Sequence, residues 1–414
     1  MLIFNKVRNK KGIKMSETNK INRTIKIYPI FYGLTADLIF WIAINTLFLT
    51  TIKNLSAAEI NSIDTIGTAV GICFQFFLIK IVRKIGNIKS IRLGTILLFL
   101  SVVLNTFSTS YFGFLVAEIC YVVGFVFKHM DNVILIKDLK YMNKSEEYVK
   151  LQTRGNTIYS FVTLVISLIS GFLFNINPYI PMVICMIICF INILLTYLFY
   201  EAPIDYEKEE TKNKKHNFTK LILLMFILYG LFYSMIAIGQ KNSKLFIQQD
   251  LQEFLTLDKV AIYMSVIIFI SRVSRLSSNL VFLKVYNKLK NKTLLLLQIL
   301  LIASFTLLLI GNFIGRNMIG IIIMAIGFFI FLLIRDPFDT YMRKTLFANS
   351  ESKNHDKIIN YITLSRKICS LIYGIIVSAM LLNLNYVYVM TLLLILSSLF
   401  IVLVIKIYNL LEKK

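Results

Sequence analysis

Two carboxylates inside long apolar stretches are the residues of this sequence that point most directly to chemistry. Asp37 lies in the apolar run 28–50, and Glu118 lies in the run 111–136. A charge near the centre of a bilayer costs about 2.5–3.5 kcal/mol on insertion scales, so such a residue persists where it faces a partner or a water-filled cavity. A carboxyl group partly withdrawn from water can take up and release a proton near neutral pH. We therefore identify Asp37 and Glu118 as candidate proton-accepting residues.

Polar and aromatic side chains at helical spacing accompany both acids. Trp41 and Asn45 follow the first acid at intervals of four residues, and Tyr121 and Lys128 share a helix face with the second. The second half of the chain adds aromatic rings that can pack on a solute and guanidinium groups that can hold an anion. These candidate cavity residues are Tyr229, Tyr233, Arg272, Arg275 and Arg335.

The same residues also have a structural interpretation. Lys128 precedes Asp131 by three positions, so the two can pair across one helical turn. Arg335 and Asp336 can likewise pair with neighbours, and the aromatic rings can serve as core packing. Both interpretations remain open at the level of sequence.

No other constellation in the sequence suggests catalysis or metal binding. The three histidines are scattered, and the five cysteines lie in apolar stretches without accompanying histidines or carboxylates. There is no glycine-rich phosphate loop and no evident nucleophile with a base. We expect no enzymatic activity, no metal site and no cofactor.

The elements that would position these residues are membrane-spanning helices. Of the 414 residues, 57% are hydrophobic, and the apolar runs are too long and continuous for the strands of a barrel. The sequence predicts an all-α membrane protein with twelve transmembrane helices. The expected spans are 28–50, 60–82, 91–109, 111–136, 153–175, 178–200, 218–240, 257–282, 293–311, 317–342, 358–382 and 385–407.

The distribution of positive charge predicts the orientation. Lys53, Lys241, Lys244, Lys259 and Arg316 occupy one set of alternate connections, whereas nearly all of the other 40 Lys and Arg residues occupy the other set. An excess of this kind marks the cytoplasmic side. We expect a multi-pass protein of the cell membrane with both termini in the cytoplasm and basic loops on anionic lipid headgroups. The net charge of +23 is thereby explained without nucleic acid.

The chain also divides into two similar halves. Lys80 to Asn87 follows the second span as Lys284 to Asn291 follows the eighth, and Tyr32-Gly33 recurs as Tyr229-Gly230. The expected organisation is a basic N-terminal tail, a six-helix bundle, a charged cytoplasmic linker, a second six-helix bundle and a short tail. Their residues are 1–27, 28–200, 201–217, 218–407 and 408–414. Met1 and Met15 are both candidate start residues.

The connection after the second span carries a family resemblance. Arg83, Lys84, Gly86, Lys89 and Arg92 resemble the basic part of the major facilitator signature between helices 2 and 3, although the signature's leading glycine and acid are missing. Residues 131–155 resemble the helix 4 to 5 connection of bacterial drug-exporter-like members. The resemblance implies two six-helix bundles related by a pseudo-twofold axis along the membrane normal.

The resemblance further implies a secondary carrier that works by alternating access, with protons as the coupling ion. Export of a small amphiphilic compound is favoured, and import of an anionic or zwitterionic metabolite is the alternative. A hypothesis from another class is a sensor or assembly partner that does not transport. We expect a monomer. Asp131 and Asp336 occupy matching places in the two repeats and could pair with Arg154 or Arg366 in an inner gate.

Overall fold

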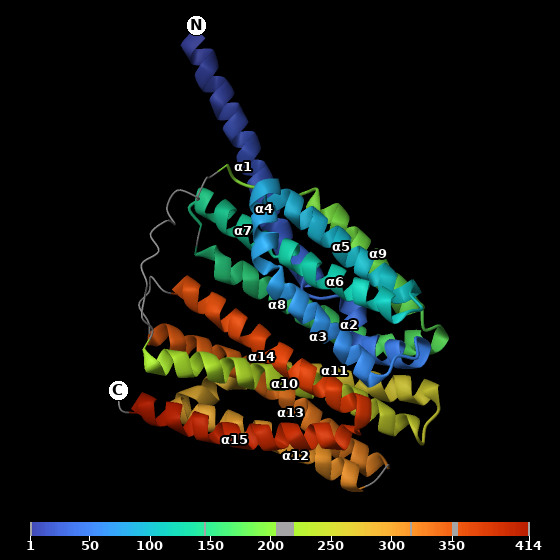
Figure 1. Ribbon diagram of the computed structural model, residues 1–414. Coiled ribbons are helices and arrows are strands. Elements are labelled where there is room, and N and C mark those ends of the chain that lie inside the picture. Colours follow the sequence, from blue (N-terminus) through green and yellow to red (C-terminus); the bar gives the residue numbers. More distant parts are fainter. Residues whose placement is uncertain (1, 145, 204–218, 315–316, 350–354, 413–414) are drawn as a thin grey trace. The chain divides into compact units, whose positions relative to one another are not determined.

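The computed structural model describes residues 2–144, 146–203, 219–314, 317–349 and 355–412, and these residues form helices joined by short connections (Figure 1). The first half of the sequence contains α1 to α9 and one π-helical turn, η1. Their bounds are α1 Leu2–Thr35, α2 Ile39–Leu47, η1 Phe48–Ile52, α3 Ala57–Cys73, α4 Gln75–Ile85, α5 Asn87–Phe107, α6 Tyr111–Lys128, α7 Met130–Tyr141, α8 Glu147–Ile176 and α9 Ile180–Thr196.

The second half contains α10 to α15 and one 3₁₀ turn, η2. Their bounds are α10 Lys220–Gln252, α11 Leu257–Leu289, η2 Lys290–Lys292, α12 Thr293–Ile314, α13 Met318–Ala348, α14 His355–Asn383 and α15 Tyr386–Glu412. The predicted all-α fold is confirmed. The predicted linker 201–217 lies mostly outside the described residues.

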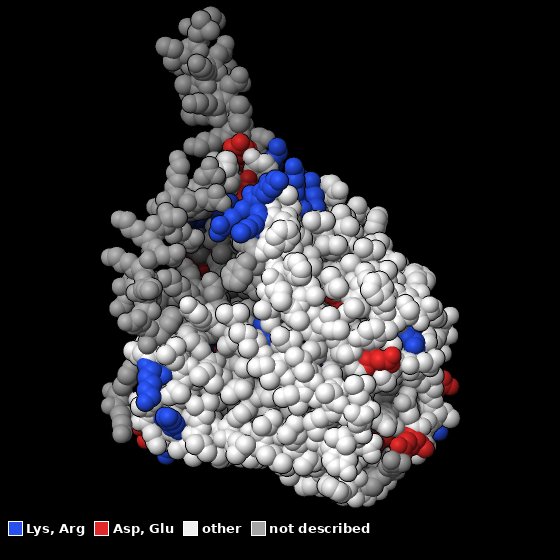
Figure 2. Space-filling model, in the orientation of Figure 1, with Lys and Arg blue, Asp and Glu red and all other residues white. Residues whose placement is uncertain are grey.

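Ten helices of the described ranges are long and apolar enough to cross a membrane. The two remaining predicted spans are the second, which is divided at Phe74 between α3 and α4, and the sixth, in which α9 has only 17 residues. Large apolar side chains such as Phe161, Leu280 and Phe313 are more than half exposed, as a lipid-facing surface requires. In Figure 2 most of the described surface in view is uncharged, and only a few Lys, Arg, Asp and Glu side chains interrupt it. The chain is therefore a multi-pass membrane protein.

Contacts group the chain into two compact units. Unit 1 contains residues 1–43, 73–166 and 179–214, and unit 2 contains residues 44–72, 167–178 and 215–414. Unit 2 thus includes two segments from the first half of the sequence. One is the α2 end with η1 and most of α3, and the other is the last turns of α8. The bundle boundaries predicted from the sequence remain a prediction.

A close helix crossing recurs in both units and supports the internal repeat. A Cβ atom on Gly33 of α1 would lie 2.6 Å from the side chain of Ile158 on α8. A Cβ atom on Gly230 of α10 would lie 2.7 Å from the carbonyl oxygen of Ser365 on α14. In each half, the first span therefore crosses the fifth at its Tyr-Gly pair, where the lack of a side chain lets the backbones approach.

The N-terminal region differs from the prediction. Residues 2–27, expected to be a tail outside the membrane bundle, form the first part of α1. Ile21, Thr24 and Ile25 are buried in unit 1, and the hydroxyl of Thr24 donates to the carbonyl of Tyr200 at 3.2 Å. The intervening basic residues lower the mean hydropathy of this segment and hide its buried face from a hydropathy criterion.

Two predicted spans are also broken where the sequence suggested continuous helix. The first is interrupted at residues 36–38, between α1 and α2, and the fourth changes helix at His129. Neither break contains glycine or proline, the residues that most often mark an interruption. The first break removes Asp37 from the regular helix that was expected to place it on one face with Trp41 and Asn45.

Candidate functional site

Asp37 lies in the break between α1 and α2, inside the first membrane-spanning segment of unit 1. Its Oδ1 atom accepts two hydrogen bonds, one from the Tyr121 hydroxyl at 3.0 Å and one from the backbone amide of Leu38 at 2.8 Å. Tyr121 comes from α6, so the proximity of these two predicted residues is observed. The two bonds fix the orientation of a half-buried carboxylate at the end of a helix.

A small cavity of about 10 Å³ adjoins this break, a volume on the scale of one water molecule. It is lined by Leu34, Thr35, Asp37, Leu38, Thr95, Leu98, Cys189 and Asn192. Asn192 belongs to α9 and is 3% exposed. Its Nδ2 donates to the carbonyl oxygen of Leu34 at 3.2 Å, and its Oδ1 is buried without a hydrogen-bond partner. Sequence reasoning missed Asn192, because only the helix crossing brings it to Asp37.

The other two residues predicted beside Asp37, Trp41 and Asn45, lie one turn apart on α2, and the Oδ1 of Asn45 accepts from the amide of Thr46. Asp37 lies outside that helix, in the break at 36–38, so the predicted common face of all three residues on one continuous helix is wrong.

Glu118, Tyr121 and Lys128 all lie on α6, as the sequence predicted. The ring of Tyr121 packs edge-on against that of Phe125, with centroids 4.7 Å apart. Lys128 is 1% exposed, and its ammonium lies 3.0 Å from the carboxylate of Asp131 on α7. The same ammonium lies 4.8 Å from the ring centroid of Tyr32. This geometry matches the structural interpretation of Lys128, in which it pairs with Asp131 three residues later.

Unit 2 contains a cluster of aromatic and guanidinium groups, the Tyr233 cluster, formed by Tyr229, Tyr233, Arg335, Asp339 and Arg366. The rings of Tyr229 and Tyr233 stack with centroids 5.6 Å apart, and the Tyr229 hydroxyl donates to Asp339 at 2.5 Å. Arg335 donates through Nε to the hydroxyl of Tyr233 at 3.1 Å. The guanidinium of Arg366 lies 5.2 Å from the centroid of the same ring.

The remaining arginines of unit 2 have other surroundings. Arg275 forms a two-pronged ion pair with Asp336, with Nε to Oδ2 at 2.7 Å and Nη2 to Oδ1 at 3.0 Å. Asn279 donates to the same carboxylate. Arg272 is buried on α11, three residues before Arg275. Asp336 is thus engaged within unit 2, and a gating role for it remains a prediction.

The predicted loop residues lie around the connection between α4 and α5. This connection is the single residue Gly86, with φ +87° and ψ 158°, a conformation that is essentially restricted to glycine. Arg83, Lys84 and Lys89 are exposed, and the guanidinium of Arg92 lies 4.4 Å from the ring centroid of Tyr197. Arg154, the other gate candidate, is exposed on α8.

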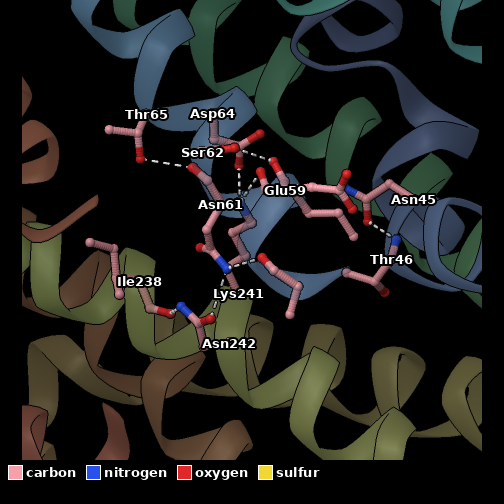
Figure 3. A network of polar contacts seen from close by, with 12 residues as sticks. Asn45, Thr46, Glu59, Asn61, Ser62, Asp64, Thr65, Ile238, Lys241 and Asn242 are labelled. Atoms are coloured by element: carbon pink, nitrogen blue, oxygen red, sulfur yellow. Dashed lines mark hydrogen bonds and ion pairs between the residues drawn. The ribbon is translucent and has the colours of Figure 1, made fainter. Parts of the chain in front are cut away.

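A second polar site was missed by the sequence prediction and is drawn in Figure 3. We call it the α3–α10 cluster; it consists of Asn61, Asp64, Lys241 and Asn242. Lys241 forms an ion pair with Asp64 and donates to the carbonyl of Ile60 at 3.1 Å. Asn61 donates to the Oδ1 of Asn242 at 3.1 Å, and both amides are buried. The cluster joins residues from the two halves of the sequence within unit 2.

The described ranges contain no group of three or more His, Cys, Asp or Glu side chains suited to hold a metal ion. The chemistry of the described sites is therefore that of carboxylates, amides, hydroxyls and guanidinium groups inside membrane spans. Such groups are expensive to bury in lipid and mark paths for ions and solutes.

Comparison with known proteins gives the family and fold. The sequence model described as Major Facilitator Superfamily matches residues 29–346. A search of curated proteins found no match. Among solved structures, the nucleoside transporter NupG superposes with a TM-score of 0.69 at 11% identity, covering 96% of this chain and 100% of that one.

Two further structures show the same fold. A bacterial homologue of the iron transporter ferroportin, in its inward-facing state, has a TM-score of 0.66 at 11% identity and covers 94% of this chain and 98% of its own. A D-xylose–proton symporter has a TM-score of 0.62 at 13% identity, with coverage of 93% and 97%. At these identities the likeness extends to the fold and leaves the transported solute open.

Proposed function

The chain belongs to the Major Facilitator Superfamily, and we propose on this basis that it is a secondary active carrier that moves a small solute across the cell membrane by alternating access. We further propose that a proton gradient drives it and that it exports an amphiphilic compound. Both termini lie in the cytoplasm, and the basic connections contact anionic lipid headgroups.

The Tyr233 cluster is the observation that carries the proposal of a solute site. Stacked tyrosine rings offer an apolar surface for a solute, and their hydroxyls and the neighbouring guanidinium groups offer polar contacts. Structural side chains buried in a membrane bundle are mostly apolar or small. A concentration of aromatic and charged groups on α10, α13 and α14 is instead typical of a solute path.

A second candidate substrate class is favoured by the arginines of the same cluster. Arg335 and Arg366 both approach Tyr233, one at its hydroxyl and one near its ring. Guanidinium groups bind carboxylates and phosphates through paired hydrogen bonds. Import of an anionic or zwitterionic metabolite is therefore the alternative to export of an amphiphilic compound.

Reconstituted vesicles with an imposed pH gradient test the proposal. We expect gradient-driven movement of at least one solute from a panel of amphiphilic cations, zwitterions and small anions. Arg366→Gln should reduce transport of an anionic solute by about tenfold, because one charged hydrogen bond contributes about 1.5–3 kcal/mol. Lys344→Gln is the matched control, since Lys344 makes a similar contact with Tyr286 outside the cluster.

The coupling residue is tested in the same vesicles. If Asp37 or Glu118 carries the proton, Asp37→Asn or Glu118→Gln should abolish uphill movement and leave gradient-free exchange in place. Undiminished gradient-driven transport in both single variants and in the double variant would show that neither acid couples. Absence of transport for every solute class would favour the sensor or assembly role instead.

A further inference from the structure

The cavity at the break between α1 and α2 presents hydrogen-bond acceptors, and this determines what it can bind. Asn192 supplies the clearest case. A carbonyl oxygen can only accept, so the bond to Leu34 fixes the amide with its nitrogen toward α1. The opposite end, Oδ1, is buried and unpartnered. An unpartnered buried oxygen costs free energy unless a donor or a cation meets it.

The two threonines of the cavity also have their hydroxyl hydrogens engaged elsewhere. Thr35 donates to the carbonyl of Phe31 at 2.7 Å. Thr95 donates to the carbonyls of Ile91 and Arg92 at 3.1 and 3.0 Å. Both side chains are buried, and each hydroxyl oxygen therefore retains only lone pairs. The lining contains the carboxylate of Asp37 and no Lys, Arg or His.

The cavity lies between the carbonyl end of α1 and the amide end of α2, and the amide of Leu38 at this break already bonds Asp37. α1 ends at Thr35, where the last carbonyls of a helix have no amide partner in the following turn and carry the negative end of the helix dipole. Broken membrane helices whose carbonyl ends face a small space are a general way to hold a monovalent cation at the depth of the bilayer. Leu34, Leu38, Leu98 and the thiol-bearing Cys189 close the remaining sides.

We propose that this break is a binding site for one sodium ion, held by Asp37, the Oδ1 of Asn192 and the oxygens of Thr35 and Thr95. The charge and size of the site favour this ion. A single carboxylate balances one positive charge, whereas calcium sites gather several carboxylates and more ligands. A cavity of about 10 Å³ accommodates one small ion stripped of its water.

The proposal rests on the proposed carrier function, because the bound sodium would serve as a coupling ion. Asp37 would then be a sodium ligand, and Glu118 would remain the candidate residue for proton coupling. Tyr121 and the Leu38 amide act as positioning groups, since they hold the Asp37 carboxylate through Oδ1.

Equilibrium binding of radioactive sodium to the purified full-length protein tests the site without a solute or a gradient. We expect saturable binding of one ion per chain, displaced by unlabelled sodium and not by potassium or choline at equal concentration. Asp37→Asn should abolish binding. Asn192→Ala should weaken it about tenfold through the loss of one buried ligand, and Asn192→Asp should retain it.

Controls separate a lost ligand from a damaged fold. Asn105→Ala removes another buried amide of unit 1, which bonds Ser101 outside the cavity, and should leave sodium affinity unchanged. Thermal unfolding should shift upward with sodium in the wild type and in Asn105→Ala, and not in Asp37→Asn. Equal sodium affinity in wild type and Asn192→Ala, or absence of saturable sodium binding, would overturn the proposal. Proton-driven transport by a chain that binds no sodium would overturn it while leaving the carrier function intact.

Discussion

Asp64 and Lys241 form an ion pair between a helix of the first sequence half and a helix of the second. Lys241 lies in the second half of α10, and Asp64 lies in the middle of α3, and the positive-inside pattern predicts that this part of both spans faces the outer side. A pair of this kind stabilises whichever conformation brings α3 and α10 together. Because the Asp64 side chain is half exposed, its contribution is modest, about 1 kcal/mol or less.

We predict that Asp64→Asn favours opening on the outer side by up to about fivefold, since 1.4 kcal/mol corresponds to a factor of ten. The measurement is the rate at which an impermeant thiol reagent added outside labels Ser243→Cys, a buried position on α10. The background lacks the five native cysteines. Glu59→Gln is the control, because Glu59 is also on α3 but bonds Ser56. An unchanged labelling rate in Asp64→Asn would exclude a gating role.

The sequence predicted individual residues correctly where their partner is close in the chain or where a charge stands in an apolar run. The Lys128–Asp131 pair follows from helical spacing, and Asp37 is recognisable as an acid in an apolar run. Asn192 and Asn242 could not be found in this way, because a lone amide in an apolar helix has no distinguishing pattern. Their roles depend on which helices cross at that position.

At the scale of the helix, Gly86 makes a sharp connection between α4 and α5 possible. Its φ of +87° with ψ 158° lies in a region that side-chain-bearing residues avoid, although a Cβ atom there would meet no neighbour within 4 Å. We predict that Gly86→Ala destabilises the folded protein by about 1–3 kcal/mol through backbone strain alone.

Thermal unfolding in detergent measures this effect, with Lys89→Ala as the control. Lys89 is exposed in the first turn of α5, so its loss removes a charge of the same connection without strain. An equal unfolding temperature for Gly86→Ala and wild type would mean that the connection relaxes into another conformation.

The helices themselves were largely predictable, and their interruptions were not. Long apolar runs gave the spans, because each must cover the hydrocarbon thickness. The breaks at 36–38 and at His129 contain no proline or glycine, and at the first of them Asp37 bonds Tyr121 of another helix. The sequence prediction missed the buried face of α1 before residue 28, because basic residues between the buried positions lower the mean hydropathy of the segment.

At the scale of the whole molecule, the charge pattern predicts the orientation in the membrane. A reporter fused after Lys414 should indicate the cytoplasm, and one inserted at Glu253, in the connection between α10 and α11, should indicate the outside. Glu253 is the appropriate site because α10 continues to Gln252, beyond the end at residue 240 expected from the sequence. A cytoplasmic signal from the Glu253 insertion would contradict the topology.

The internal repeat allowed the architecture to be predicted from the sequence. The grouping of the contacts into two units could not be predicted in this way. The Tyr-Gly pairs at Gly33 and Gly230 mark equivalent helix crossings. The assignment of residues 44–72 and 167–178 to unit 2 depends on packing between distant segments. Apolar side chains on a membrane helix do not specify which neighbour they contact, so no pattern in these segments predicts their partner.

The single tryptophan of the chain is Trp41, which lies in the first turn of α2, just beyond the break that contains Asp37. Light absorbed selectively by indole therefore excites one position in the entire protein. Any change in the tilt or hydration of α2 alters the wavelength and intensity of that emission, with no dye attached. The native protein thus carries its own optical probe, and stopped-flow fluorescence can time events at the helix break in detergent, in nanodiscs and in sealed vesicles alike.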